Sequence, residues 1–351
     1  MAGEIEDDPG GRHRGHRAVK GAAITLDRHL READGQGRDL PEGLAALLSA
    51  LAGASKILAR QVRRAALSGS LGYSGGVNVT GDSQKKLDVI ANETVLEAVA
   101  STGLVAAVVS EELKGAKALA EQGEARYILC TDPLDGSSNT DINGAVGTIF
   151  GIYPRAADGP VDEVRDLLRR GSEQIAAGYV MYGPATVLVY TAGDGVFGFT
   201  LDEDAGTFVL THDRIRCPSR GHYYSANLGH LKEWRPGIRK YVEHLTERDP
   251  STGRPYSLRY VGALVADLHR GLIEGGLYFY PADEGHANGK LRLLYECAPL
   301  AFVVEQAGGR ASTGAQRILE VRAESIHQRV PLVIGSALDV ELYETFMRRE
   351  P

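Results

Sequence analysis

The sequence predicts a mixed α/β protein with two domains. Its 351 residues are 43% hydrophobic, which is enough for one large core or two. Apolar residues recur with a helical period in the first third of the chain, whereas the middle third holds short apolar runs separated by Gly, Pro and Asp. Near Arg216 this β-rich pattern gives way to mixed helix and strand. We therefore expect strands and helices in both domains.

Three parts are expected along the chain. Residues 1–22 mix Gly, Asp, Glu, Arg and His without periodicity, which predicts a flexible N-terminal tail. Residues 23–215 are expected to form an N-terminal domain, and residues 216–351 a C-terminal domain.

In the N-terminal domain, helices come before the β-rich part. Residues 43–66 have apolar positions at the period of an amphipathic helix, and residues 88–100 are also helical in pattern. The apolar runs 104–109 and 127–131 are short enough for buried strands. Four further strands, separated by turn residues, are expected at 146–153, 178–182, 185–191 and 195–201.

The polar segment 158–173 interrupts these strands, and its charge predicts a surface excursion. In the C-terminal domain, helical periodicity covers residues 261–274, and a strand is expected at 277–280. A last helix is expected to follow Pro299 and to end near Gly308.

Composition excludes several classes of protein. The chain has 39 Lys and Arg against 46 Asp and Glu, and the resulting net charge of −7 argues against nucleic-acid binding. No apolar run approaches the ~18 residues of a membrane span, and the chain does not begin with the apolar core of a signal peptide. Three well-separated cysteines argue against a disulfide framework or a zinc cage. We expect a cytoplasmic protein without nucleic-acid or membrane partners.

Acidic residues follow two candidate strands, at the point where each strand ends. Glu111 and Glu112 come after the first run, and Asp132 and Asp135 come after the second in the sequence Asp-Pro-Leu-Asp. Open sheets bind ligands at the carboxyl edge of their strands, and oxygen-only ligands suit Mg²⁺ or Mn²⁺. One glutamate would then bind metal while the other handles a proton.

Small residues follow directly. Gly136, Ser137 and Ser138 offer backbone N–H groups and hydroxyls, which bind phosphate at a turn or a helix N-terminus. Metal and phosphate would then be adjacent, as metal-assisted hydrolysis of a phosphate ester requires.

Each of these motifs also has an ordinary alternative. Asp-Pro-x-Asp-Gly is a common turn, and adjacent glutamates commonly begin a solvated helix. Asp82 and Asp88 precede a helix, where N-capping is the ordinary role. Lys85 has the ordinary role of surface charge.

Seven segments together resemble class I fructose-1,6-bisphosphatase, in the lithium-sensitive, magnesium-dependent sugar and inositol phosphatase superfamily. They are NVTGDSQKKLDVIANE (78–93), VVSEE (108–112), DPLDGSSN with GTIFGIY (132–153), AAGYVMYGPAT (176–186), GFTLDE (198–203), RYVGALVADLHR (259–270) and NGKLRLLYECAPLAFVVEQAGG (288–309). DPLDGSS is typical of the superfamily, and the last two segments are typical of this branch. The resemblance implies the sugar phosphatase fold, a layered α/β (α+β) sandwich with two domains of mixed sheets flanked by helices.

The resemblance also implies an activity. It is the metal-dependent hydrolysis of the 1-phosphate of D-fructose 1,6-bisphosphate to fructose 6-phosphate and phosphate, in gluconeogenesis or the Calvin cycle. Two or three Mg²⁺ or Mn²⁺ ions per subunit and a homotetramer are expected on the same grounds. Two alternatives stay open: a bifunctional enzyme that also hydrolyses sedoheptulose 1,7-bisphosphate, and a non-catalytic regulator that binds sugar phosphates.

Metal and catalytic roles can be carried over residue by residue. The residues that match the family's metal ligands are Glu111, Asp132, Asp135 and Glu296, with the backbone carbonyl of Leu134. Asp88 and Glu112 match the pair that orients and deprotonates the attacking water. Asp82 matches a loop aspartate that engages the site.

Substrate roles are carried over in the same way. The amides of Gly136, Ser137 and Ser138 would hold the 1-phosphate. The residues that match those around the sugar and its 6-phosphate are Asn227, Arg259, Tyr260, Tyr280 and Lys290. In the family, a neighbouring subunit supplies Arg259, and Arg292 lies near the metal cluster.

One residue departs from the family pattern. Where the family usually has Asn-x-Gly-Tyr, this chain has His230 in place of the tyrosine. The imidazole would replace the hydroxyl that contacts the 6-phosphate, and its charge would vary with pH near neutrality.

Overall fold

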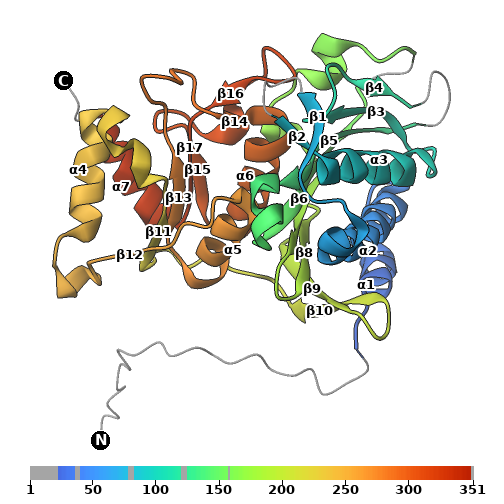
Figure 1. Cartoon of the computed structure of the whole chain (residues 1–351), viewed down its shortest axis with the longest axis horizontal. Coiled ribbons are helices and arrows are strands. Elements are labelled where there is room, and N and C mark those ends of the chain that lie inside the picture. The colour runs from blue at the N-terminus through green and yellow to red at the C-terminus, as the bar shows by residue number, and fades with distance from the viewer. Residues whose placement is uncertain (1–22, 36–39, 78–82, 120–124, 157–158, 349–351) are drawn as a thin grey trace, which may run out of the picture.

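The computed structural model describes residues 23–35, 40–77, 83–119, 125–156 and 159–348. Two mixed sheets and three layers of helices alternate across this part of the chain (Figure 1). This arrangement confirms the predicted layered α/β fold with mixed sheets flanked by helices.

The larger sheet has eight strands. In spatial order they are β10 (Thr207–His212), β9 (Val196–Asp202), β8 (Thr186–Thr191), β7 (Ala176–Tyr182), β6 (Val146–Pro154), β5 (Tyr127–Asp135), β3 (Val105–Ser110) and β4 (Lys117–Ala118). All neighbours are antiparallel except β3 and β5, which run parallel. The strands predicted in this region are confirmed, although β5 runs four residues further than expected.

The smaller sheet comes from the C-terminal part of the chain. Its strands, in spatial order, are β12 (Ser257–Leu258), β11 (Tyr223–Ser225), β13 (Leu277–Tyr280), β17 (Leu332–Gly335) and β15 (Arg310–Ser312). Two antiparallel pairs of strands lie outside both sheets: β1 (Tyr73–Val77) with β2 (Ser83–Lys85), and β14 (Leu291–Arg292) with β16 (Arg329–Val330). The strand predicted at 277–280 is confirmed as β13.

Three helices cover the outer face of the larger sheet: α1 (Leu26–Gly35), α2 (Leu44–Ser68) and α3 (Lys86–Ala100). The apolar period of α2 gives it a buried face that includes Leu44, Leu47 and Leu51. Gly69 ends α2 in the left-handed conformation, with φ of 70°, and its N–H donates to the carbonyl of Ala65. The helices predicted at 43–66 and 88–100 are therefore confirmed.

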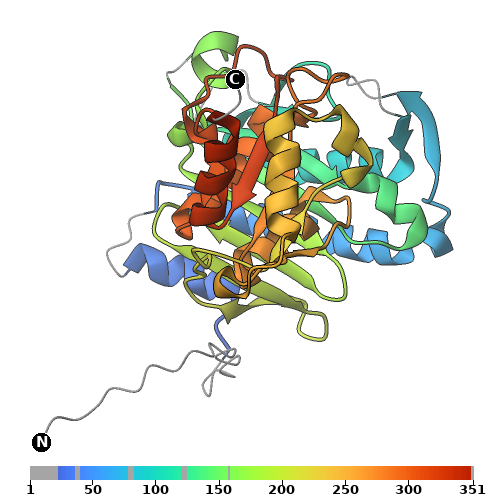
Figure 2. The same cartoon turned by 90° about the vertical axis from the view of Figure 1, so that its left-hand side faces the viewer.

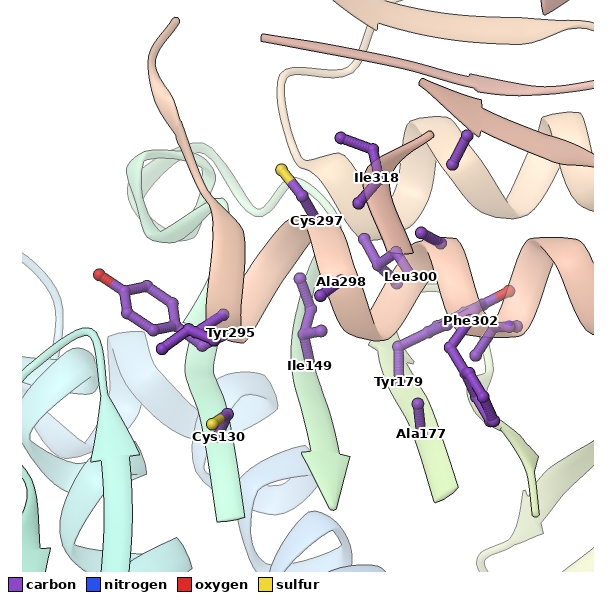
Figure 3. Packing of buried hydrophobic residues seen from close by; sticks show 14 of the residues in the cluster. Cys130, Ile149, Ala177, Tyr179, Tyr295, Cys297, Ala298, Leu300, Phe302 and Ile318 are labelled. Carbon is purple, nitrogen blue, oxygen red and sulfur yellow. The ribbon is translucent and has the colours of Figure 1, made fainter. Parts of the chain in front are cut away.

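Two helices lie between the sheets, α5 (Leu264–Glu274) and α6 (Ala298–Gln306). Residues 298–304 of α6 are all buried, as expected for a helix that is apolar on every side. Figure 3 shows α6 packed on the larger sheet, with Leu300 and Phe302 near Ala177 and Tyr179 of β7. The helices predicted at 261–274 and after Pro299 are confirmed with small shifts at their starts.

The outer face of the smaller sheet is covered by α4 (Pro236–Thr246) and α7 (Ala337–Arg348), which contact each other and can be followed in Figure 2. Short 3₁₀ segments join these elements: η1 (Ser137–Ile142), η3 (Gly171–Glu173), η4 (Leu228–Glu233), η5 (Pro250–Thr252) and η7 (Ile318–Glu320). Two single π-helical turns are η2 (Glu163–Leu167) and η6 (Leu293–Cys297). Among the helices described, none has the length and apolar character to span a membrane.

The prediction of a surface excursion at 158–173 is wrong for part of that segment. Asp166 and Leu167 are buried, although both lie in this polar stretch. The Asp166 carboxylate accepts hydrogen bonds from the backbone N–H groups of Ala156 and Asp162, at 3.0 and 2.9 Å, and pairs with Arg165. A buried carboxylate with this many donors stabilises a local turn rather than a solvated loop.

Candidate active site

Carboxylates from three elements meet beside the larger sheet. β3 and β5 are parallel and in register at Ser110 and Thr131, so Glu111, just after β3, lies beside Asp132 in β5. Glu296 comes from the π-helical turn η6. Ligand oxygens of Glu111, Asp132 and Glu296 all lie within 4.8 Å of one another. The two strand ends thus meet as predicted, and η6 adds a third carboxylate.

We expected the sequence Asp-Pro-Leu-Asp to follow its strand. It instead forms the last four residues of β5. Asp132 pairs with Ile149 of β6 and Asp135 with Gly147, so β5 has one extra residue between these pairs. Proline has no N–H to give to a ladder, and strands with an internal proline commonly bulge there. The bulge keeps both aspartates in the strand, where both line the same cavity.

Asp135 connects the larger sheet to a helix of the C-terminal part of the chain. Its carboxylate accepts hydrogen bonds from the backbone N–H groups of Leu264 and Val265, at 3.1 and 2.8 Å, in the first turn of α5. Gly136 follows with φ of 74°, and a Cβ there would lie 2.4 Å from the Cβ of Ala263. This close approach requires glycine at the turn that leads into Ser137 and Ser138.

Glu296 is held by its own turn. Its carboxylate accepts a hydrogen bond from the backbone N–H of Arg292, four residues earlier. Arg292 is itself buried, and its positive charge acts on Glu111 and Glu296. Single π-helical turns are frequent at functional sites, and here the turn presents a carboxylate just before a buried helix.

Asp88 and Glu112 are the two predicted catalytic acids that the structure describes. Asp88 is in the first turn of α3 and accepts a hydrogen bond from the backbone N–H of Lys85 at 2.7 Å. The Gln84 side chain donates to the Glu112 carboxylate. Both acids line the same cavity as Glu111, Asp132 and Glu296.

Lys85 is not the surface charge that we expected. Its side chain is only 8% exposed, pairs with Asp141, and lies with its Nζ 4.0 Å from the ring centre of Tyr73. Lys85 and Tyr73 both line the cavity. The spacing of the two residues could have indicated this position. Lys85 lies three residues before Asp88, at the start of the predicted helix, and this spacing brings an N-cap residue close to an acid in the first turn.

A cavity of about 420 Å³ collects these groups. Its lining residues are Tyr73, Lys85, Asp88, Glu111, Glu112, Asp132, Leu134, Asp135, Gly136, Ser137, Ser138, Lys290 and Glu296. The structure therefore brings most of the predicted metal, catalytic and 1-phosphate residues into one place. Asp82 lies outside the described residues.

The electrostatics of this cavity favour bound cations. Burial, followed by repulsion from neighbouring carboxylates, raises the pKa of Glu111 and Asp132 well above their usual values. Burial also raises the pKa of Asp135 to about 6 and that of Glu296 to about 7. Divalent cations would relieve this repulsion, and an all-oxygen donor set fits Mg²⁺ or Mn²⁺.

Among the residues predicted to surround the sugar and its 6-phosphate, Lys290 lines this cavity, and it is connected to two others that do not. The Lys290 Nζ lies 5.9 Å from the ring centre of Tyr280, and the Tyr280 hydroxyl contacts the side chain of Asn227. Lys290 lines the cavity, so this group leads away from the carboxylates. Tyr260 is 38% exposed, and the partial burial of its side chain raises its pKa to about 12.

Arg259, His230 and Arg292 are placed differently. Arg259 is exposed, and its guanidinium donates to the carbonyl of Leu258 at 2.7 Å. His230 lies on η4, with its Nδ1 3.0 Å from Oε2 of Glu233. Arg292 is buried, and its Nε has no hydrogen-bond partner among the residues described.

Two family models match the chain. "Fructose-1-6-bisphosphatase, N-terminal domain" covers residues 23–213, and "Fructose-1-6-bisphosphatase, C-terminal domain" covers residues 217–348. The chain belongs to the fructose-1,6-bisphosphatase family. The resemblance deduced from the sequence is thereby confirmed.

Curated relatives agree with this membership of the fructose-1,6-bisphosphatase family. A fructose-1,6-bisphosphatase class 1 of Acaryochloris marina is 54% identical, over 88% of this chain and 93% of its own. The class 1 protein of Chlorobium phaeobacteroides is 48% identical, over 92% of this chain and 97% of its own. As a member of this family the chain is a phosphatase, which confirms the prediction of a phosphoric monoester hydrolase.

A solved structure of the fructose-1,6-bisphosphatase family has the same fold. The crystal structure of Leishmania major fructose-1,6-bisphosphatase in holo form aligns with a TM-score of 0.87 and 39% identity. The alignment covers 94% of this chain and all of that one. The sugar phosphatase fold predicted from the resemblance is therefore confirmed.

The buried carboxylates of this family member predict an unusual dependence of stability on pH. A carboxyl group with a raised pKa in the folded chain holds its proton more tightly there, so its contribution is present at low pH and lost as pH rises through the folded value. For Glu296 this interval runs from its ordinary value of 4.5 to about 7. In a chelator, the melting temperature should therefore lose a contribution across this interval, whereas Mg²⁺ should restore it.

Thermal melts across this pH range, with chelator and with Mg²⁺, would measure the difference. Only the difference between the two series reports on the cluster, because other carboxylates titrate equally in both. In Glu296→Gln, the melting temperatures in chelator and in Mg²⁺ should differ less across this pH range than they do in the unsubstituted chain. Parallel series for the unsubstituted chain would contradict the assignment of these raised pKa values to a metal centre.

Proposed function

We propose that the chain hydrolyses the 1-phosphate of fructose 1,6-bisphosphate to fructose 6-phosphate and phosphate, as a cytoplasmic enzyme of gluconeogenesis or the Calvin cycle. The observation that carries the proposal is one cavity in which buried carboxylates lie beside the Gly136–Ser138 turn. Membership of the fructose-1,6-bisphosphatase family gives the substrate.

The carboxylate cluster would hold the metal ions. In this proposal the ligands are Glu111, Asp132, Asp135 and Glu296, with the carbonyl of Leu134, and two or three Mg²⁺ or Mn²⁺ ions bind per subunit. Such ions neutralise phosphoryl oxygens and lower the pKa of bound water. The closeness of the three oxygens and their raised pKa values support this donor set.

Asp88 and Glu112 would position the attacking water and accept its proton. Both line the cavity. Burial raises the pKa of Asp88, although the hydrogen bond from Lys85 opposes the shift. A carboxylate with a raised pKa is a better proton acceptor near neutral pH. Asp82, which matches a loop aspartate of the family, would also engage the site.

Backbone amides and cations would hold the two phosphates. Gly136, Ser137 and Ser138 form the start of η1, where free N–H groups can bind the 1-phosphate. Lys290, which also lines the cavity, would bind the 6-phosphate with Asn227, Tyr260, Tyr280 and His230. Arg292 would balance the charge of the cluster from its buried position.

Arg259 supports the proposal of a homotetramer. Its side chain is exposed and does not line the cavity of its own chain. An exposed guanidinium is suited to a bidentate contact with a phosphate at a neighbouring subunit's site. In such an assembly Arg259 of one subunit would complete the 6-phosphate site of the next.

Paired assays test the proposal and its alternatives. Phosphate release from fructose 1,6-bisphosphate and from sedoheptulose 1,7-bisphosphate should be measured with Mg²⁺, with Mn²⁺ and with a chelator. We expect release of the 1-phosphate of fructose 1,6-bisphosphate only with a divalent cation. Equal rates on both sugars would favour the bifunctional enzyme, and binding without release would favour the regulator.

Lys290→Gln should weaken substrate binding more than turnover. Removing one charged hydrogen bond costs about 1.5–3 kcal/mol, which corresponds to about a 10–150-fold rise in KM. We expect kcat to change much less, because the 6-phosphate does not react. Initial rates over a range of fructose 1,6-bisphosphate concentrations separate the two quantities.

The matched control is Lys240→Gln on the exposed side of α4. It should leave KM unchanged. If Lys290→Gln had the same KM as the unsubstituted chain, this lysine would not belong to the proposed 6-phosphate site.

A further inference from the structure

A second group of side chains that could bind a metal ion lies outside the cluster of Glu111, Asp132 and Glu296. His230, Glu233 and Asp283 each offer one ligand atom, and these atoms all lie within 4.8 Å of one another. His230 and Glu233 are one turn apart on η4, whereas Asp283 follows β13. None of the three lines the cavity that holds the other carboxylates.

The backbone brings these residues together. Trp234, directly after Glu233, forms an antiparallel bridge with Asp283. The Trp234 ring packs on Phe279 of β13, with ring centres 5.7 Å apart. Both sides of the cluster are therefore fixed by the smaller sheet and its core, and the approach of the side chains does not depend on a mobile loop.

The Asp283 carboxylate is buried and held in place by His286, as suits an anionic metal ligand. Its side chain is only 2% exposed, and its Oδ1 accepts a hydrogen bond from the backbone N–H of His286 at 2.7 Å. The His286 Nδ1 lies 3.0 Å from the same oxygen. Burial raises the pKa of Asp283, but the contacts with His286 outweigh it, so the net shift is downward and the group is ionised at neutral pH. Carboxylates that bind metal are themselves held by hydrogen bonds from an outer partner, as Asp283 is held here by His286.

The donor set differs in kind from that of the carboxylate cluster. One imidazole with two carboxylates favours a borderline transition metal such as Zn²⁺ over Mg²⁺, which prefers oxygen alone. Three protein ligands leave at least one coordination position for water or another ligand. A cavity of about 650 Å³, lined in part by Glu233 and Asp283, provides room for it.

We propose that His230, Glu233 and Asp283 bind one Zn²⁺-type divalent transition-metal ion per chain, separately from any ions in the carboxylate cluster. His286 acts as the outer partner that orients Asp283. The site goes beyond the proposed hydrolysis and does not depend on it. It gives His230 a second role, because an imidazole bound to metal does not donate the same nitrogen to a phosphate.

Calorimetric titration of the full chain with Zn²⁺ in saturating Mg²⁺ tests the proposal, because Mg²⁺ competes for all-oxygen sites and only Zn²⁺ at the proposed site should be lost in His230→Gln. We expect one Zn²⁺ per chain. His230→Gln and Asp283→Asn should each weaken binding by at least about 100-fold, and His286→Gln by about 10–100-fold. Co²⁺ in place of Zn²⁺ should give visible absorption bands that are lost in His230→Gln.

His222→Gln is the matched control, because this imidazole is exposed in the same part of the chain and outside the cluster. It should bind Zn²⁺ as the unsubstituted chain does. Absence of Zn²⁺ binding in saturating Mg²⁺, or unchanged binding by His230→Gln, would overturn the proposal. The His230 side chain is partly exposed, so this variant decides the question even if Asp283→Asn does not fold. All of these readouts are independent of phosphate release.

Discussion

Glu112→Gln is expected to lower kcat by about 10²–10⁴-fold while the affinity for fructose 1,6-bisphosphate stays nearly unchanged. Glutamine has the size of glutamate and fills the same place in the cavity, but it cannot accept a proton from the attacking water. The contact with Gln84 can be kept, because the new side chain retains a carbonyl oxygen. Phosphate release gives kcat, and calorimetry gives the affinity.

Glu93→Gln serves as the control, because Glu93 is exposed on α3, away from the cavity. It should retain full activity. A Glu112→Gln variant with the turnover of the unsubstituted chain would rule out Glu112 as the proton acceptor. Loss of both turnover and binding would instead point to a structural role for this residue.

Asp132→Asn should have opposite effects on the metal-free and metal-bound protein. Burial and then the charges of Glu111 and Asp135 raise the pKa of Asp132, so its ionised form is unfavourable in the folded chain. In chelator at about pH 8 the variant should therefore melt no lower than the unsubstituted chain. Asparagine can still accept the hydrogen bond that the Leu134 N–H gives to Oδ1.

With Mg²⁺ the order should reverse. A ligand present at 100 times its Kd stabilises a protein by about 2.7 kcal/mol, and a variant that has lost a metal ligand loses most of that gain. Melts in chelator and in Mg²⁺, with exposed Asp204→Asn as control, measure both effects. A variant stabilised by Mg²⁺ as strongly as the unsubstituted chain would exclude Asp132 from the metal centre.

Local patterns predicted the long helices and the central strands well. The period of residues 43–66 and the apolar run at 277–280 correspond closely to α2 and β13. The end of β5 was not predictable in this way, because proline and aspartate are typical of turns. Only pairing with β6, which accommodates one extra residue, keeps Asp132 to Asp135 in the strand.

The smaller sheet was mostly beyond local prediction. Its strands are two to four residues long, and most are separated by helices, so each carries too little pattern to be recognised. Asp166 shows the same limit for burial, because its hydrogen bonds with the backbone N–H groups of Ala156 and Asp162 outweigh the polarity of its neighbours. The domain division at residue 215 stays a prediction.

The site was predictable where its residues share a sheet edge. Glu111 and Asp132 could be placed together because each follows or ends one of two parallel strands. Glu296 lies far along the chain, and only the family resemblance pointed to it. Lys85 was missed because nothing in its own sequence shows that Asp141 and Tyr73 enclose it.

A count of bound Mn²⁺, made by electron paramagnetic resonance on the same samples as phosphate release from fructose 1,6-bisphosphate, tests the metal centre most directly. A catalytic metal centre predicts that activity rises as the ions bind and that Asp132→Asn loses both bound Mn²⁺ and activity. Hydrolysis at full rate in chelator, or an Asp132→Asn variant that binds as many ions as the unsubstituted chain, would contradict it.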